Sequence, residues 1–386
     1  MYKRLIDLSL TKTESAFLWG ARQTGKSTLL HALFPGALRY DLLLSHEYHR
    51  FIRNPGVLRE DLESQGTLGA NQKAPIIIDE IQKVPELLDE IHWLIENKKL
   101  RFILCGSSAR KLRRGHGKLL GGRAVRYEMH PLVYPEIPGF DLEKALNHGL
   151  LPRHYQHTAP KRLLQSYVGD YLREEITAEA LVRNVQSFSR FLEVAALSNG
   201  EIINYENIAR ECSVSAPTVK EYYQIAVDTL VGSFLPAYTR IVKRRLIHAP
   251  KFFFFDVGVV AELCKRGNVE FGSELFGKVF EHSIYLEILT YSHYSGLYFP
   301  LSYWRTASQI EVDFLLGDAQ IAVEVKSTRN ANSNHLRGLK GFREEHPKAR
   351  AILVSNDPKG RKTQDGIEII PWEIFLRNLW NGKIIK

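Results

Sequence analysis

The first third of the chain alternates short, wholly apolar runs with segments of helical spacing. The apolar runs are Ala16-Phe17-Leu18-Trp19, Ile76-Ile77-Ile78 and Phe102-Ile103-Leu104-Cys105. A run without polar positions is typical of a strand that is buried on both faces of a parallel sheet. Residues 85–95 place apolar side chains three and four positions apart, which predicts a helix packed against that sheet. The pattern predicts an α/β fold, with a parallel sheet covered by helices on both faces.

The spacing changes in the middle of the chain. Residues 131–152 are rich in Pro and Gly and predict a linker, and residues 160–182 keep a helical spacing that predicts a lid. Residues 187–237 contain three short amphipathic segments, the last two separated by the tight turn Val214-Ser215. A short turn followed by a helix with a serine N-cap and a proline in its first turn is typical of a helix-turn-helix unit.

The last third alternates apolar strands with helices. The pattern predicts a helix over residues 271–290. Strands are expected at residues 251–256, 301–306, 310–316, 319–327 and 351–354. This region therefore predicts a second α/β unit.

One loop in the first third carries the clearest chemistry. It is Gly20-Ala21-Arg22-Gln23-Thr24-Gly25-Lys26-Ser27, followed by Thr28, and it joins an apolar run to a helical segment. The glycines let successive backbone N–H groups point at one phosphate, and the helix that follows adds the positive end of its dipole. Lys26 is expected to reach the β- and γ-phosphates, and the Ser27 hydroxyl to bind Mg²⁺. The alternative is a chance loop of this composition, which the strand before it and the helix after it disfavour.

Two acidic residues end the second apolar run. Asp79 and Glu80 follow Ile76-Ile77-Ile78, and ligands of open α/β sheets bind at the carboxyl ends of strands. This is the Walker B pattern, in which Asp79 holds Mg²⁺ through water and Glu80 orients the attacking water. The alternative is that the acids only cap the next helix. The phosphate-binding loop upstream favours the catalytic interpretation.

The helix-turn-helix segment suggests contacts to DNA. The first residues of its third helix would enter the major groove, which gives Thr218 and Lys220 as candidates. A basic segment follows, whose Lys243, Arg244 and Arg245 could meet phosphates. The alternative is a winged helix that serves only for packing between protein regions.

The last third carries a nuclease-like set of side chains. Side chains alternate along a strand, so Glu324 and Lys326 share one face, and Asp313 lies on the preceding strand. Two acids and an amine around one point is the arrangement in divalent-metal nucleases, where the acids hold Mg²⁺ and the amine orients water. Glu281 could reach the same point from its helix. The alternative is a scaffold that binds DNA without cutting it.

The composition of the chain indicates which kind of partner it binds and in which cellular compartment it is expected. A formal net charge of +9 favours an anionic partner, DNA first, although a basic surface without such a partner is the alternative. The three cysteines lack metal-ligand spacing and are expected to be buried thiols in a reducing compartment. No apolar run is long enough to span a bilayer, so no membrane association and a cytoplasmic location are expected.

The whole chain resembles a family of bacterial and archaeal AAA-type ATPases. Members have an AAA core, a winged-helix middle and a C-terminal domain of unknown function that is similar to a restriction endonuclease. The resemblance rests on residues 20–27, Asp79-Glu80-Ile81-Gln82, Gly106-Ser107-Ser108, Leu120-Gly121-Gly122-Arg123, Tyr303-Trp304-Arg305-Thr306, Glu311-Val312-Asp313-Phe314 and Val323-Glu324-Val325-Lys326. The family commonly has Thr at the position of Ser27, and both residues offer a hydroxyl to Mg²⁺.

The resemblance implies ATP and Mg²⁺ as ligands, assembly into a homo-oligomeric ring, and a link to DNA. It implies that Ser107 or Ser108 senses the γ-phosphate, although a simple Gly-Ser-Ser turn is the alternative. Residues 110–126 hold seven basic and no acidic residues, in the region where ring-forming ATPases place an arginine that reaches the neighbouring subunit's nucleotide. Arg123 is the candidate for that role, and the alternative is a solvated basic face.

The expected units are an AAA-type core over residues 1–130, a linker and helical lid over 131–185, a winged helix-turn-helix over 186–247 and a restriction-endonuclease-like domain over 248–386. The first functional hypothesis is an oligomeric ATP-driven motor or switch that acts on DNA. The second is an ATP-gated, Mg²⁺-dependent nuclease. The third is a nucleotide-dependent regulator that binds a protein partner.

Overall fold

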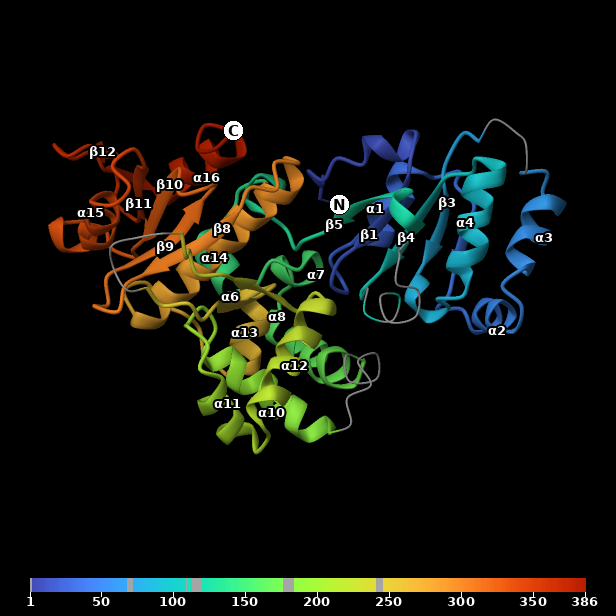
Figure 1. Ribbon diagram of the computed structural model, residues 1–386, viewed down its shortest axis with the longest axis horizontal. Coiled ribbons are helices and arrows are strands. Elements are labelled where there is room, and N and C mark those ends of the chain that lie inside the picture. The colour runs from blue at the N-terminus through green and yellow to red at the C-terminus, as the bar shows by residue number, and fades with distance from the viewer. Residues whose placement is uncertain are drawn as a thin grey trace.

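The computed structural model describes residues 2–67, 72–108, 110, 112, 120–175, 184–240 and 246–386. Three regions can be followed along the chain in Figure 1: a parallel sheet with its helices on the right, a group of helices below, and a second sheet on the left. Among the described residues, no helix has both the length and the apolar character that crossing a membrane requires.

The first region is the predicted α/β unit, built on a five-stranded sheet in the order β2-β3-β4-β1-β5. Every strand pair in it is parallel, which confirms the expectation drawn from the apolar runs. Its strands are β1 (Ser15–Trp19), β2 (Arg39–Asp41), β3 (Ile76–Asp79), β4 (Phe102–Gly106) and β5 (Ala124–Glu128). Its helices are α1 (Lys26–Leu33), α2 (Ser45–Arg53), α3 (Val57–Ser64) and α4 (Leu87–Lys98). Strand β1 lies inside the sheet, between β4 and the edge strand β5, so the loop that follows it lies at the sheet's carboxyl edge beside the ends of both strands.

The middle region is helical. It contains α6 (Leu142–His148), α7 (Pro152–Tyr155), α8 (Pro160–Ser166), the π-helix η5 (Tyr167–Glu175), α10 (Val185–Leu197), α11 (Tyr205–Cys212), α12 (Ala216–Asp228) and α13 (Val257–Leu263). Asn184, Asn204 and Ser215 cap α10, α11 and α12 with side-chain oxygens that accept backbone N–H groups. The three helices expected for a helix-turn-helix are therefore present, with a tight turn between the second and the third.

One strand pairs differently from the sequence-based expectation. The sequence pattern groups the phenylalanine-rich strand β7 (Lys251–Phe254) with the last third, but its partner is β6 (Gly232–Leu235), in an antiparallel two-stranded sheet. Phe252 and Phe254 pack into the core of the middle region, while Phe253 packs into the core of the last region. Because all three side chains are equally apolar, the sequence alone could not assign the strand to one core.

The last region contains a six-stranded sheet in the order β12-β13-β11-β10-β9-β8. The pairs β8–β9, β9–β10 and β12–β13 are antiparallel, and the pairs β10–β11 and β11–β13 are parallel. The strands are β8 (Leu301–Arg305), β9 (Glu311–Leu316), β10 (Ile321–Val325), β11 (Arg350–Ser355), β12 (Arg361–Lys362) and β13 (Glu368–Pro371). The helices are α14 (Glu274–Tyr294), α15 (Arg337–Arg343) and α16 (Trp372–Trp380). The predicted helix over residues 271–290 and the predicted strands at 301–306, 310–316, 319–327 and 351–354 follow one another as expected, whereas β12, β13 and α16 were not predicted.

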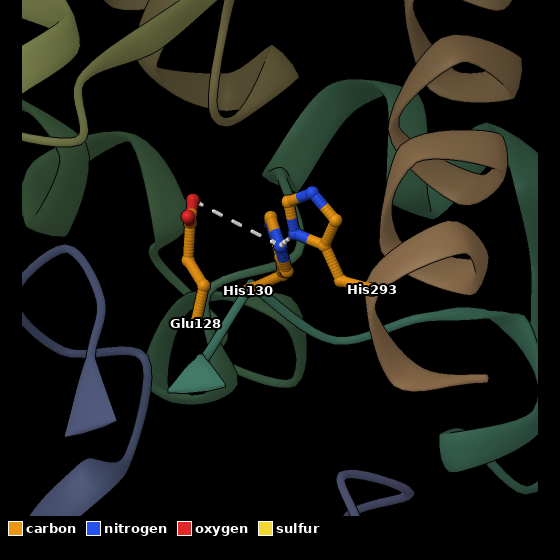
Figure 2. A group of neighbouring side chains, drawn as sticks. All are labelled: Glu128, His130 and His293. Atoms are coloured by element: carbon orange, nitrogen blue, oxygen red, sulfur yellow. Dashed lines mark hydrogen bonds and ion pairs between the residues drawn. The ribbon is translucent and has the colours of Figure 1, made fainter. Parts of the chain in front are cut away.

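The long helix α14 connects the last region to the first. Its C-terminal end lies beside the chain that leaves β5, where His293 faces His130 and Glu128 (Figure 2). Tyr294 accepts a hydrogen bond from the backbone N–H of His130 at 3.1 Å. The two α/β regions therefore touch next to β5, the edge strand of the first sheet.

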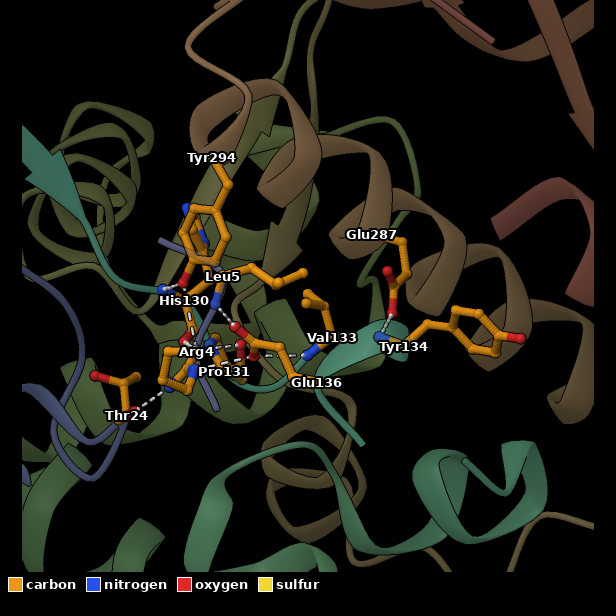
Figure 3. Close-up of polar contacts among 10 residues, drawn as sticks. All are labelled: Arg4, Leu5, Thr24, His130, Pro131, Val133, Tyr134, Glu136, Glu287 and Tyr294. Carbon is orange, nitrogen blue, oxygen red and sulfur yellow. Dashed lines mark hydrogen bonds and ion pairs between the residues drawn. The ribbon is translucent and has the colours of Figure 1, made fainter. Parts of the chain in front are cut away.

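Glu287, in the middle of α14, joins three segments from a fully buried position. Its carboxylate accepts hydrogen bonds from the Tyr134 backbone N–H at 2.7 Å and from the Trp380 indole at 2.6 Å (Figure 3 shows the first). Burial raises the pKa of Glu287 from 4.5 to about 8, although both hydrogen bonds act in the opposite direction. The folded state therefore binds this proton more tightly than the unfolded chain does.

We expect stability to fall with rising pH because of Glu287. The contribution of its protonated form is complete below about pH 4.5 and is lost as the pH rises through about 8. The loss has an upper bound of about 5 kcal/mol, since each pKa unit corresponds to about 1.4 kcal/mol. The free energy of unfolding, measured with denaturant at about pH 5 and about pH 9, should differ less between the two pH values in Glu287→Gln than in the parent. The exposed Glu373→Gln on α16 is the control, and an unchanged difference in Glu287→Gln would contradict the assignment.

Candidate nucleotide-binding site

The loop of residues 20–27 has the backbone of a phosphate-binding loop. Gly25 has φ +99°, the left-handed region that favours glycine, and it directly precedes α1. A side chain at Gly20 would lie 2.5 Å from the Met129 carbonyl oxygen, so this position also requires glycine. The buried Lys26 ammonium donates hydrogen bonds to the carbonyls of Gly20 (2.6 Å) and Ala21 (3.1 Å). The loop thus encloses the amine that would meet a phosphate.

The acidic pair at the end of β3 lies against this loop. The Ser27 hydroxyl donates a hydrogen bond to Asp79 Oδ2 at 2.6 Å. Burial lowers the pKa of Lys26, and the nearby Glu80, Cys105 and Asp79 act in the opposite direction. The structure therefore brings Lys26, Ser27, Asp79 and Glu80 together from two elements that are far apart in sequence.

Glu80 is held in an unusual conformation beside these groups. Its backbone has φ 58° and ψ 44°, which costs energy for a residue other than glycine and is often associated with functional sites. Its carboxylate accepts hydrogen bonds from the Gln82 amide and, at 3.4 Å, from Ser107. Gln82 also donates to Ser107 Oγ at 3.1 Å. A side chain at Gly106 would collide with Gln82 and Trp19, so glycine keeps this network possible.

A cavity of about 310 Å³ adjoins the loop. Its lining residues are Tyr2, Arg4, Thr24, Gly25, Thr28, Leu29, Pro152 and Arg153. The π-helix η5 reaches the loop from another side, where the Tyr167 hydroxyl donates to the Arg22 carbonyl at 3.2 Å and Tyr171 lies under the Arg22 guanidinium. The loop is therefore in contact with both the N-terminal segment and the helical region.

The basic segment after β4 is only partly described. Arg110 is buried and pairs with Asp228 at 3.0 Å and with Glu221 at 3.7 Å, both on α12. Ser108 donates to the Asp228 carbonyl at 3.4 Å, so the end of β4 is joined to the end of α12. Arg123 is partly exposed and forms an ion pair with Glu96 of its own chain.

The candidate DNA-contacting residues lie on one helix, as far as they are described. Lys220 is exposed, with its ammonium 5.2 Å from the centre of the Tyr205 ring. The Thr218 hydroxyl is 2.8 Å from the hydroxyl of Ser215, the N-cap of α12. Lys243, Arg244 and Arg245 lie outside the described residues.

The candidate nuclease residues gather at one face of the last sheet. Glu324 and Asp313 are buried, Lys326 pairs with Glu324 at 2.6 Å, and Asp313 accepts a hydrogen bond from the Val325 N–H at 2.8 Å. Burial raises the pKa of Glu324 to about 8 and that of Glu281 to about 7. The ligand atoms of Glu281, Asp313 and Glu324 do not all lie within 4.8 Å of one another.

Sequence reasoning missed one ion pair at this cluster. Lys251 is buried and contacts Glu281 at 3.3 Å and Glu311 at 2.6 Å. Lys251 comes from β7, the strand that pairs with the middle region. A single lysine before four phenylalanines carries no sequence signal for such a role.

Comparison with sequence families identifies the first region. Residues 12–138 match the model of the AAA domain. The first region is therefore similar to AAA domains, and we call it the AAA domain. Residues 139–270 match a domain of unknown function (DUF8612), and residues 276–375 match another (DUF4143). The DUF8612 match runs across the boundaries expected at residues 185 and 247, and neither description mentions a winged helix or an endonuclease.

Comparisons with curated proteins and with solved structures do not extend the match beyond the AAA domain. No curated protein matches the chain. A crystal structure of a signal transduction ATPase with numerous domains from Pyrococcus horikoshii, which carries a tetratricopeptide repeat sensor, matches with 14% identity and a TM-score of 0.24. The match covers 76% of this chain and 49% of that one, so the chain spans about half the length of that structure. A TM-score this low does not establish a shared overall arrangement.

One further residue of the AAA domain's surroundings escaped the sequence analysis. The Arg4 side chain is 4% exposed and pairs with the buried Glu136 at 2.9 Å. It also donates to the Thr24 carbonyl of the loop (2.6 Å), to the His130 carbonyl (2.7 Å) and to the Tyr294 hydroxyl (3.3 Å) (Figure 3). An arginine at position four of a chain offers no pattern from which these contacts could be predicted.

Proposed function

We propose that the chain binds and hydrolyses ATP at the loop of residues 20–28 and uses the hydrolysis to act on DNA. The observation that supports hydrolysis best is the contact of Ser27 with Asp79, with Lys26 and Glu80 beside it. A P-loop hydroxyl and a Walker B carboxylate are the Mg²⁺-binding groups of P-loop ATPases. No other group of described side chains combines a phosphate-binding loop with an acid able to activate water.

The donor set fits Mg²⁺. The Ser27 hydroxyl oxygen would bind the ion directly, and Asp79 Oδ2, 2.6 Å away, would hold the ion through a water molecule. Bound with ATP, Mg²⁺ would neutralise charge on the β- and γ-phosphates. Lys26 would exchange its two carbonyl acceptors for phosphate oxygens. Glu80 would break its hydrogen bonds to Gln82 and Ser107 and would then orient the attacking water. Ser107, once released, would contact the γ-phosphate.

Ring assembly and DNA binding are parts of the same proposal. Arg123 would reach the nucleotide of a neighbouring subunit after release from Glu96, an exchange that its partly exposed position allows. The net charge of +9 and the exposed Lys220 at the start of α12 support a polyanionic partner. Through the contacts of Arg110 with α12, the end of β4 could pass a change at the nucleotide to the helix-turn-helix.

A second function, Mg²⁺-dependent cleavage of DNA in the last region, has one observation in its favour. Glu324 Oε2 is buried without a hydrogen-bond partner among the described residues, next to Asp313 and Lys326. A buried carboxylate oxygen without a partner is costly unless a ligand occupies the space beside it. A divalent cation held by Asp313 and Glu324 would supply that partner.

One assay separates these functions from the third hypothesis. ATP hydrolysis is measured with and without single-stranded, duplex and branched DNA at two salt concentrations, and the DNA is then run on a gel. We expect DNA to stimulate hydrolysis, more strongly at low salt, while remaining intact. Cleavage that needs Mg²⁺ and disappears in Asp313→Asn would establish the nuclease. No hydrolysis would refute the proposal, and hydrolysis without DNA binding at low salt would favour a regulator with a protein partner.

A further inference from the structure

Three potential metal ligands meet where the AAA domain touches α14. Glu128 and His130 are two positions apart at the end of β5, so their side chains point to the same side of an extended chain. His293 lies in the last turn of α14. One ligand atom from each residue lies within 4.8 Å of the other two (Figure 2). Among the described residues, this is the group of three side chains whose donor atoms are gathered tightly enough to share one ion.

The individual distances fit a metal centre after a small adjustment. His130 Nε2 and His293 Nδ1 are 2.7 Å apart, and Glu128 Oε1 is 3.9 Å from His130 Nε2. Ligands of a tetrahedral Zn²⁺ ion are about 3.3 Å apart, given bonds of about 2.0–2.1 Å. The imidazoles would therefore separate by about half an ångström while the carboxylate moves inward. The two ring nitrogens face each other across a hydrogen bond, which an ion between them would replace.

The surroundings hold these ligands in position. His130 is buried, and two hydrogen bonds hold its backbone. Its N–H donates to the Tyr294 hydroxyl, and its carbonyl accepts from the Arg4 guanidinium. The charge of Arg4 is offset by its ion pair with Glu136. His293 lies at a helix C-terminus, where the helix dipole favours a positive charge.

We propose that Glu128, His130 and His293 bind a divalent transition-metal ion of the Zn²⁺ class, which links the AAA domain to the last region. Two imidazoles and one carboxylate suit Zn²⁺, Co²⁺ or Ni²⁺ better than Mg²⁺ or Ca²⁺. Three protein ligands leave a fourth position for water. The ligands from β5 flank Met129, whose carbonyl oxygen is in close contact with Gly20, so the ion would lie one residue from the wall of the nucleotide site.

The test uses the full chain after removal of metal by a chelator. Co²⁺ is titrated while visible absorption is followed, and Zn²⁺ affinity is measured by competition with a chromogenic chelator. We expect one tightly bound ion per chain with the absorption of a tetrahedral Co²⁺ site. Loss of a ligand in His293→Ala should weaken binding by more than about 100-fold, and Glu128→Gln by at least about 10-fold. His46→Ala, whose side chain is 73% exposed, should bind as the parent does.

Two results would overturn the proposal. One is the absence of a one-to-one complex with Co²⁺ or Zn²⁺ in the parent protein. The other is unchanged affinity in both His293→Ala and Glu128→Gln. Because neither His293 nor Glu128 is buried, these variants should remain folded, which circular dichroism can verify, and the outcome does not depend on the buried His130.

Discussion

Replacing Glu80 by Gln is expected to lower the rate of ATP hydrolysis by at least about 100-fold while ATP still binds. Gln has nearly the same shape and keeps an oxygen that can accept the hydrogen bond of Gln82. It lacks the negative charge that would polarise the attacking water. Glu80 is not part of the phosphate-binding loop, so the groups that bind ATP, Lys26 and Ser27 among them, remain in place.

The measurement pairs phosphate release with equilibrium binding of ATP. Glu86→Gln is the matched control, since it makes the same chemical change six residues further on at an exposed position. Its turnover should equal that of the parent. If Glu80→Gln hydrolyses ATP at the parent rate, another group activates the water. If it loses binding as well as turnover, Glu80 supports the site's structure rather than its chemistry.

The central parts of this site could be predicted because their signals are local. Eight consecutive residues specify the loop, and two acids after an apolar run specify the end of β3. The parallel sheet followed from the same apolar runs. In each case the feature depends on residues close in sequence, so the pattern and the structure report the same constraint.

The surroundings of the site could not be predicted because they depend on distant partners. Gln82 belongs to the motif that follows the apolar run, but no pattern predicts its hydrogen bond to Ser107, which only the fold brings to it. The left-handed backbone of Glu80 has no sequence signal either, since the residue is not Gly, Asn or Asp. The meeting of Glu128 and His130 with His293 depends on the fold, since His130 and His293 are 163 positions apart in sequence.

Arg4 shows how such distant contacts join the regions. Its guanidinium contacts the loop at Thr24, the chain after β5 at His130, and α14 at Tyr294. Five donors in a planar fork allow one arginine to serve several acceptors at once, which lysine cannot reproduce. A movement of the loop would therefore shift the Arg4 side chain and, through it, the hydrogen bond to Tyr294 at the end of α14.

Arg4→Met should lower the free energy of unfolding by about 3–5 kcal/mol, the usual cost of leaving one member of a buried ion pair alone. The Glu136 side chain has no exposed surface, and burial raises its pKa even with Arg4 present. Without Arg4 the pKa of Glu136 would rise further above its unfolded value. The variant should therefore be closest to the parent at low pH and lose stability as the pH rises.

Denaturant unfolding at low and neutral pH measures this loss, with the exposed Lys3→Met as the control for charge removal. Adding Glu136→Gln to Arg4→Met should restore part of the stability at neutral pH, because the uncompensated charge is gone. ATP affinity should also fall, since the Thr24 carbonyl loses its donor and the loop loses a fixed support. A stable Arg4→Met protein would contradict the ion-pair argument. A destabilised variant with normal ATP affinity would instead limit Arg4 to holding the regions together, with no role in ordering the nucleotide loop.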